Sequence, residues 1–126
     1  MTDERPLAGK RILVLEDDFY LASDEKALLE RAGASVAGPF GGGCGEGDIA
    51  GAGTLDGAVV DINLGGGPSF EFARMLAGRG VPFLFLTGYD GWALPDAYRA
   101  APRVAKPFAA GQVIDALRCA MREGLS

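Results

Sequence analysis

Short apolar runs that end abruptly in polar residues constrain the fold of this sequence more than any other feature. The run 11–15 (RILVL) ends in Glu16 and Asp17, and such a run is typical of a parallel strand that is buried on both faces. The residues that follow place apolar side chains at helical spacing. Asp17 or Asp18 can cap the start of that helix, and Gly33 can end it. The beginning of the chain therefore predicts a strand followed by a helix.

The same order of strand and helix recurs along the chain. Further strands are expected at 35–37, 58–62, 83–86 and 103–105, and further helices at 68–77 and around 113–121. Two other helices are weakly encoded. Nine glycines lie in 38–57, and glycines and prolines in 88–102 leave room only for a short helix at 95–101. The pattern predicts an α/β fold, a doubly wound five-stranded parallel sheet with weak second and fourth helices.

Length and composition favour one globular domain that acts in the cytoplasm. The chain has 126 residues, of which 48% are hydrophobic and 23% charged. We expect an N-terminal extension at 1–10, a domain at 11–123, no attached output domain and a monomeric state. The net charge of −5 opposes direct binding to nucleic acid. No apolar run approaches the roughly 18 residues that a membrane span needs.

The chain contains no histidine. This excludes Ser-His and Cys-His catalysis, the usual zinc sites and any role as a phosphohistidine carrier. The chemistry of the protein must therefore come from carboxylates, hydroxyl groups and lysine.

Several polar residues are expected where strands end, namely Glu16, Asp17, Asp61, Thr87 and Lys106. The carboxyl ends of parallel strands lie at one edge of a sheet, so these side chains should converge. Three carboxylates repel one another unless a cation neutralises them, and hard oxygen ligands favour Mg²⁺. The metal and Lys106 would offset the charge of a phosphoryl group, Thr87 would donate to it, and Asp61 would be the nucleophile.

The segments 12–17, 59–63, 87–88 and 106–108 resemble the motifs of response-regulator receiver domains, in the same order and at similar spacing. The resemblance covers nearly the whole chain and implies the flavodoxin-like receiver fold. It implies an acidic pair at Glu16 and Asp17, the phosphoacceptor Asp61, the switch hydroxyl Thr87 and the active-site lysine Lys106. The implied Mg²⁺ ligands are Glu16, Asp17, Asp61 and the backbone carbonyl of Asn63. The resemblance further implies a cis peptide bond between Lys106 and Pro107.

The segment around Thr87 carries a narrower resemblance. Residues 85–89 (FLTGY) are similar to the Phe-Ala-Thr-Gly motif of a subgroup of stand-alone receivers with a degenerate fourth helix, with Leu86 in place of alanine. Asn63 and Tyr89 resemble the pair that tunes the lifetime of the phosphorylated state. Arg103 stands where many receivers carry an aromatic switch residue, so we expect Tyr89 to replace that aromatic and Arg103 to adjust the partner surface.

The family implies a protein that catalyses only its own phosphorylation and dephosphorylation. Its expected partners are a sensor histidine kinase or a histidine phosphotransfer protein, together with a downstream protein target. The alternative is a receiver-like adaptor that acts without phosphorylation. Taken alone, the acidic residues after the first strand could also be simple helix caps.

Two other uses of this architecture fit the sequence less well. The FMN phosphate of a flavodoxin would be repelled by the acidic residues 16–18. An aspartyl-phosphate hydrolase would place a general acid two residues after Asp61, where Asn63 stands.

Overall fold

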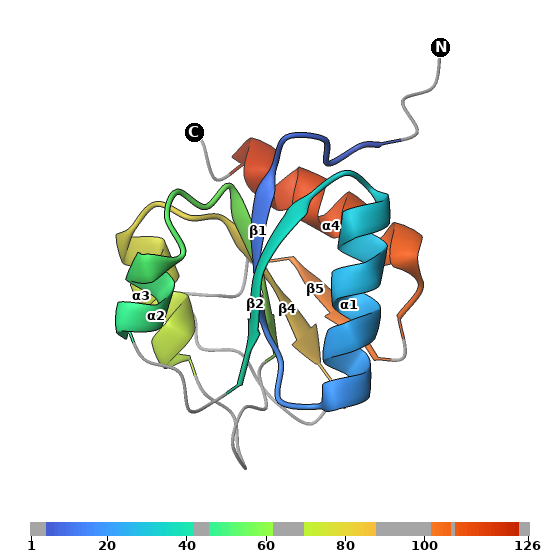
Figure 1. Cartoon of the computed structure of the whole chain (residues 1–126). Coiled ribbons are helices and arrows are strands. Elements are labelled where there is room, and N and C mark those ends of the chain that lie inside the picture. Colours follow the sequence, from blue (N-terminus) through green and yellow to red (C-terminus); the bar gives the residue numbers. More distant parts are fainter. Residues whose placement is uncertain (1–4, 42–45, 62–69, 88–101, 107, 124–126) are drawn as a thin grey trace.

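The computed structural model describes residues 5–41, 46–61, 70–87, 102–106 and 108–123. The strands are β1 (Arg11–Leu15), β2 (Ser35–Phe40), β3 (Gly57–Asp61), β4 (Phe83–Thr87) and β5 (Arg103–Ala105). The helices are α1 (Phe19–Arg31), α2 (Glu46–Gly51), α3 (Glu71–Gly78) and α4 (Ala110–Glu123). The strands form one parallel sheet in the order β2-β1-β3-β4-β5 (Figure 1). The predicted α/β class and the five strands are therefore confirmed.

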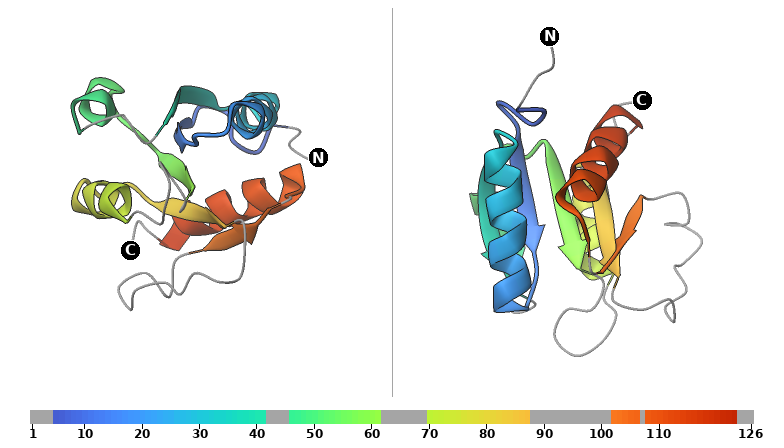
Figure 2. Two further views of the ribbon diagram at one scale, coloured as in Figure 1. Left: turned by 90° about the horizontal axis from the view of Figure 1, so that it is seen from below. Right: turned by 90° about the vertical axis from the view of Figure 1, so that its right-hand side faces the viewer.

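Helices cover both faces of the sheet (Figure 2). The α1/α4 face is the one on which these two helices pack, and α2 and α3 pack on the opposite face. Successive residues of a strand point to opposite faces. Leu13 accordingly lies in the core beneath α2 and α3, and Val14 lies in the core beneath α1 and α4. Because both faces are covered, the interior strands β1, β3 and β4 are mostly apolar, which makes them recognisable in the sequence.

Local signals set both ends of α1. The Asp18 side chain caps the helix, because its Oδ1 accepts hydrogen bonds from the backbone N–H groups of Tyr20 and Leu21 at 2.9 and 3.0 Å. Gly33 follows the last turn with a φ of +100°, in the left-handed region that favours glycine. A Cβ at Gly33 would also lie 2.9 Å from the backbone of Ala8. Of the two possible caps that the sequence offered, the structure uses Asp18.

The other predicted helices agree with the structure to different extents. The weakly encoded second helix is α2, which has only six residues. The helix expected at 68–77 corresponds to α3, whose described residues begin at Glu71. The short helix expected at 95–101 lies outside the described residues. None of the helices in the described ranges is both long enough and apolar enough to cross a membrane.

The N-terminal residues 5–10 pack against the domain. The Leu7 side chain is fully buried in the core of the α1/α4 face. Its backbone N–H donates to the carbonyl of Ala32 at 2.8 Å, and the carbonyl of Lys10 accepts from the N–H of Ser35 at 2.9 Å. These contacts tie the segment to the end of α1 and the start of β2.

We expect Leu7→Ala to lower the free energy of unfolding by about 2–4 kcal/mol, because it removes a fully buried side chain from a packed core. Urea denaturation followed by circular dichroism measures this change. Lys10→Ala, at an exposed position of the same segment, is the control and should change stability by less than about 0.5 kcal/mol. Equal stability of the two variants would mean that the segment contributes nothing to the fold.

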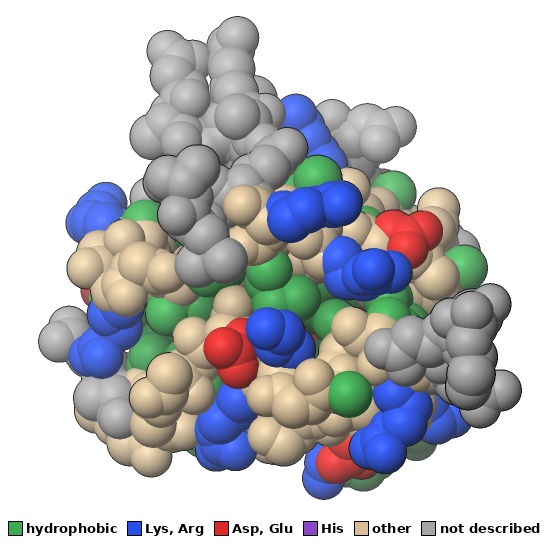
Figure 3. All heavy atoms as spheres, turned by 90° about the horizontal axis from the view of Figure 1, so that it is seen from above, with side chains coloured by type: hydrophobic (Ala, Val, Ile, Leu, Met, Phe, Trp, Pro, Cys, Tyr) green, Lys and Arg blue, Asp and Glu red, His purple; other side chains and the backbone are tan. Residues whose placement is uncertain are grey.

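Basic side chains gather at the edge of the sheet where the strands begin (Figure 3). On this side a hollow of about 240 Å³ is lined by Pro6, Met121 and the basic residues Lys10, Arg118 and Arg122. Lys10 precedes the first residue of β1, whereas the acidic residues follow its last one. The positive charge of this hollow is therefore at the opposite edge of the sheet from the carboxylates described next.

Candidate phosphoryl-transfer site

Three of the predicted site residues meet where the strands end on the α1/α4 face. Glu16 follows β1, Asp61 is the last residue of β3, and Lys106 follows β5. Each stands two residues after a valine in the core of that face, namely Val14, Val59 and Val104. Because side chains alternate along a strand, all three polar residues are directed to the same side as those valines. The sequence prediction that they converge agrees with this arrangement.

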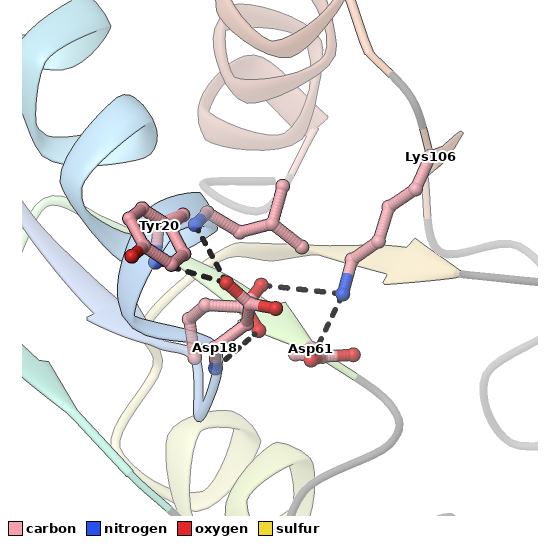
Figure 4. A network of polar contacts seen from close by, with 6 residues as sticks. Asp18, Tyr20, Asp61 and Lys106 are labelled. Atoms are coloured by element: carbon pink, nitrogen blue, oxygen red, sulfur yellow. Dashed lines mark hydrogen bonds and ion pairs between the residues drawn. The ribbon is translucent and has the colours of Figure 1, made fainter.

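Lys106 joins the two carboxylates (Figure 4). Its Nζ lies 3.0 Å from Asp61 Oδ2 and 3.3 Å from Glu16 Oε1. Its backbone N–H donates to the carbonyl of Thr87 at 2.8 Å, which extends the pairing of β4 and β5 to this residue. Glu16 and Asp61 are almost fully buried, with 4% and 3% of their surface exposed. Buried carboxylates are costly unless they are paired, so the Lys106 ammonium is needed to hold both in place.

The pKa values of the cluster reflect this pairing. Burial alone would raise the pKa of Glu16, but hydrogen bonds with Asp61 and Glu25 and the charge of Lys106 hold it below its ordinary value. Burial likewise opposes the charge of Lys106. The hydrogen bond with Asp61 and the charges of Asp61 and Glu16 nevertheless raise the pKa of Lys106. Glu16 and Lys106 are therefore both ionised at neutral pH.

Asp17, the next residue along the chain, is exposed, whereas Glu16 is buried. The Asp17 side chain lies against Gly41, just beyond the end of β2. A Cβ at Gly41 would come within 2.7 Å of Asp17 Oδ1, so this approach depends on glycine at position 41. The neighbouring Asp18 caps α1, and its backbone N–H donates to Glu16 Oε2 at 3.2 Å. The three consecutive acids 16–18 thus face three different surroundings.

The remaining predicted site residues are described only in part. Thr87 is the half-buried last residue of β4, next to the cluster through its backbone bond to Lys106. Arg103 is the exposed first residue of β5. Asn63, Tyr89 and the peptide bond to Pro107 lie outside the described residues. Their expected roles remain predictions.

Glu25 is a member of the cluster that sequence reasoning missed. It lies on α1 with its side chain fully buried, and it hydrogen-bonds with Glu16. Burial and the adjacent Glu16 raise the pKa of Glu25 to about 10. The buried stripe of α1 contains a signal that could have revealed it, because Glu25 stands three residues from both Ala22 and Leu28. An acid at a core position of an amphipathic helix needs a partner in the interior.

The donor chemistry of the site fits Mg²⁺. Among the described residues no three His, Cys, Asp or Glu side chains are arranged to hold a metal ion. Glu16 Oε1 is buried; in the described part of the chain it forms the ion pair with Lys106 Nζ at 3.3 Å but accepts no hydrogen bond. The carboxylates of Glu16 and Asp61 are hard oxygen donors of the kind that Mg²⁺ prefers. A cation bound here would stabilise both buried carboxylates by offsetting their negative charge.

Comparison with known proteins places the chain in a family. No protein-family model matches the sequence, and no curated protein matches it. Among solved structures, the solution structure of SdrG from Sphingomonas melonis Fr1 is 30% identical, with a TM-score of 0.76, and the match covers 93% of this chain and 98% of that one. A second SdrG structure, in a BeF3-activated conformation, is also 30% identical, with a TM-score of 0.72 and coverage of 94% and 97%.

Two further structures carry the family name. The signal receiver domain of a modulated diguanylate cyclase from Desulfovibrio desulfuricans G20 is 29% identical, with a TM-score of 0.71 and coverage of 92% and 96%. A response regulator receiver protein from Sinorhizobium medicae WSM419 is 24% identical, with a TM-score of 0.75 and coverage of 91% and 96%. The chain belongs to the response-regulator receiver domains. The receiver fold accounts for the order of its five strands and for a polar site at their carboxyl ends.

Proposed function

We propose that this receiver accepts a phosphoryl group on Asp61 in a Mg²⁺-dependent reaction and signals through contacts with other proteins. The ammonium of Lys106, 3.0 Å from a buried Asp61 carboxylate, carries the proposal. It places a positive charge next to the carboxylate that stands at the end of β3, the middle strand of the sheet. A phosphoryl group arriving there would meet that charge.

The proposed reaction transfers a phosphoryl group to the Asp61 carboxylate. A carboxylate oxygen attacks phosphorus, the bond from phosphorus to the leaving group breaks, and that bond's electron pair departs with the leaving group. Lys106 stabilises the negative charge around phosphorus, and Thr87 donates its hydroxyl to a phosphoryl oxygen. Glu16, Asp17, Asp61 and the Asn63 carbonyl would hold Mg²⁺. The metal ion would supply further positive charge at the phosphoryl oxygens.

The phosphoryl donor must be another protein or a small molecule. The chain has no histidine, so it cannot form a phosphohistidine of its own. A sensor histidine kinase or a histidine phosphotransfer protein in the cytoplasm would supply the group. We propose that Asn63 and Tyr89 tune the lifetime of the acyl phosphate, and that Arg103 lies on the surface that meets a downstream protein.

Incubation with acetyl phosphate and Mg²⁺ tests the proposal. Intact-protein mass spectrometry should show the gain of one phosphoryl group, which is labile in base and maps to Asp61, and EDTA should prevent the gain. The complex with BeF3⁻ should protect the amides around Thr87 from hydrogen exchange relative to the free protein. If no adduct forms, and if the affinity for a partner protein is the same with and without acetyl phosphate, the phosphorylation-independent adaptor would be favoured instead.

A further inference from the structure

A hollow with basic walls lies between the N-terminal segment and α4, away from the phosphoryl site. Pro6 and Lys10 line it from the segment before β1, and Arg118, Met121 and Arg122 line it from α4. Figure 3 shows apolar surface between basic side chains on this side of the molecule. We call this feature, with a volume of about 240 Å³, the basic hollow.

The core of the domain holds both walls of the basic hollow in place. The backbone N–H of Lys10 donates to the carbonyl of Leu7 at 3.0 Å, and the Leu7 side chain is fully buried. On α4, Met121 lies against the start of β3, because a Cβ at Gly57 would be 3.4 Å from its Sδ. The fold therefore sets where the lining residues stand, and a partner would not have to order them first.

The three basic side chains of the hollow are exposed and unpaired in the described part of the chain. None of Lys10, Arg118 and Arg122 forms an ion pair or a side-chain hydrogen bond there. Arg118 and Arg122 stand one turn apart on α4, where like charges repel each other. A basic residue is favourable in the last turn of a helix, which accounts for Arg122 but not for Lys10. The cluster therefore attracts negative charge from outside this part of the chain.

The shape of the basic hollow favours an acidic protein segment over a small anion. Pockets that enclose small ligands have volumes of roughly 300–1,000 Å³, whereas this hollow is smaller and its basic side chains are exposed. An inorganic anion would leave the apolar surface of Pro6 and Met121 uncovered, whereas an apolar side chain of a peptide would cover it. Arginine guanidinium groups also match carboxylates in shape and hydrogen-bonding geometry.

We propose that the basic hollow is a docking surface for an acidic segment of a partner protein, in which an apolar side chain lies among carboxylates. The apolar side chain would cover Pro6 and Met121, and the carboxylates would pair with the three basic residues. The net charge of the chain is −5, so an acidic partner is repelled by the protein as a whole and attracted here, which would orient it. This docking does not depend on phosphoryl transfer, because the hollow and Asp61 lie at opposite edges of the sheet.

A capped peptide of sequence Glu-Glu-Leu-Glu-Glu tests the proposal. It is titrated into the isotope-labelled full chain, and the amide chemical shifts are followed by NMR. Shifts should concentrate at Lys10 and at residues 118–122, and the affinity should fall as NaCl is raised, because salt screens exposed charges. A peptide with glutamine in place of glutamate, and one with serine in place of leucine, should each bind at least about fivefold more weakly.

Charge reversals separate the basic hollow from the overall charge of the protein. Arg118→Glu and Lys10→Glu should each weaken binding of the acidic peptide at least about fivefold. Arg74→Glu, the same change at an exposed position of α3, is the matched control and should stay within about twofold of the wild type. All three positions are exposed, so the urea midpoints of unfolding should remain close to that of the wild type.

Three results would overturn the proposal. If Arg74→Glu and Arg118→Glu weaken binding equally, the peptide responds only to the net charge of the protein. If sodium pyrophosphate binds in the hollow more tightly than the peptide, the hollow is a site for small anions. If the peptide shifts no amides at Lys10 or at residues 118–122, the hollow does not dock acidic segments.

Discussion

The Asp61→Asn variant should incorporate no detectable phosphoryl group from acetyl phosphate, which corresponds to a rate below that of the wild type by a factor on the order of 10³ or more. An amide does not attack phosphorus as a carboxylate does, and the acyl phosphate cannot form. The fold should persist, because asparagine has nearly the same shape and its oxygen can still accept from Lys106 Nζ. A time course by intact-protein mass spectrometry measures the effect.

Asp24→Asn is the matched control for this experiment. It makes the same chemical change at an exposed position of α1 and should be phosphorylated at the wild-type rate. Circular dichroism should give similar spectra for both variants. Phosphorylation of Asp61→Asn at the rate of the control would place the acceptor on another residue and contradict the assignment of Asp61.

The metal-free protein should lose stability as the pH rises through the neutral range. The pKa of Glu25 is near 4.5 when the side chain is free and is raised to about 10 in the fold. Between these values the folded protein holds a proton that the unfolded chain has released, so raising the pH favours unfolding. The free energy of unfolding should fall by as much as about 1.4 kcal/mol per pH unit for this one proton.

The other members of the cluster act outside this pH window. The lowered pKa of Glu16 gives stability that is lost only as the pH falls below its ordinary value of 4.5. The raised pKa of Lys106 gives stability that is lost only above its ordinary value of 10.5. Glu16 and Lys106 both act on Glu25, but neither of them lowers the free energy of unfolding between pH 4.5 and pH 10.5. A slope in the neutral range that is present in the wild type and absent from Glu25→Leu therefore reports Glu25.

Urea denaturation in EDTA, at several values between about pH 5.5 and about pH 8.5, measures this slope. Glu25→Leu and Glu25→Gln carry no titrating group at position 25 and should show little dependence on pH over the same range. Equal slopes in the wild type and in Glu25→Leu would show that another group is responsible. The measurement needs neither Mg²⁺ nor a phosphoryl donor, so it is independent of the proposed function.

The strands and the strand-end residues could be predicted from the sequence because their causes are local. A parallel strand covered on both faces must be a continuous apolar run, and runs such as 11–15 and 83–86 cannot be confused with loops. The start of α1 was signalled by acids before the helix, and its end by Gly33. Because the strands pair in parallel, the residues that follow each strand lie at the same edge of the sheet. In this way Asp61 and Lys106, 45 positions apart, could be expected to meet.

The surroundings of the acidic residues could not be predicted in the same way. Glu16, Asp17 and Asp18 are consecutive, yet Glu16 is buried beside Lys106, Asp17 lies against Gly41, and Asp18 caps α1. Which direction each takes depends on how β1 turns into α1 and on where β2 ends. Both depend on how segments that are distant in the sequence pack together, and the local sequence does not reveal this.

The sequence by itself determined the class of fold, the edge of the sheet at which chemistry is possible, and the charged residues available there. Only the tertiary structure decided that Leu7 belongs to the core and that Glu25 lies against Glu16. The physical reason is that an isolated apolar residue, or one acid in a helix, takes its environment from segments far away in the sequence. Burial and a neighbouring carboxylate turn Glu25 from an ordinary surface acid into a buried one with a raised pKa, and both come from the packing of α1 over the end of β1.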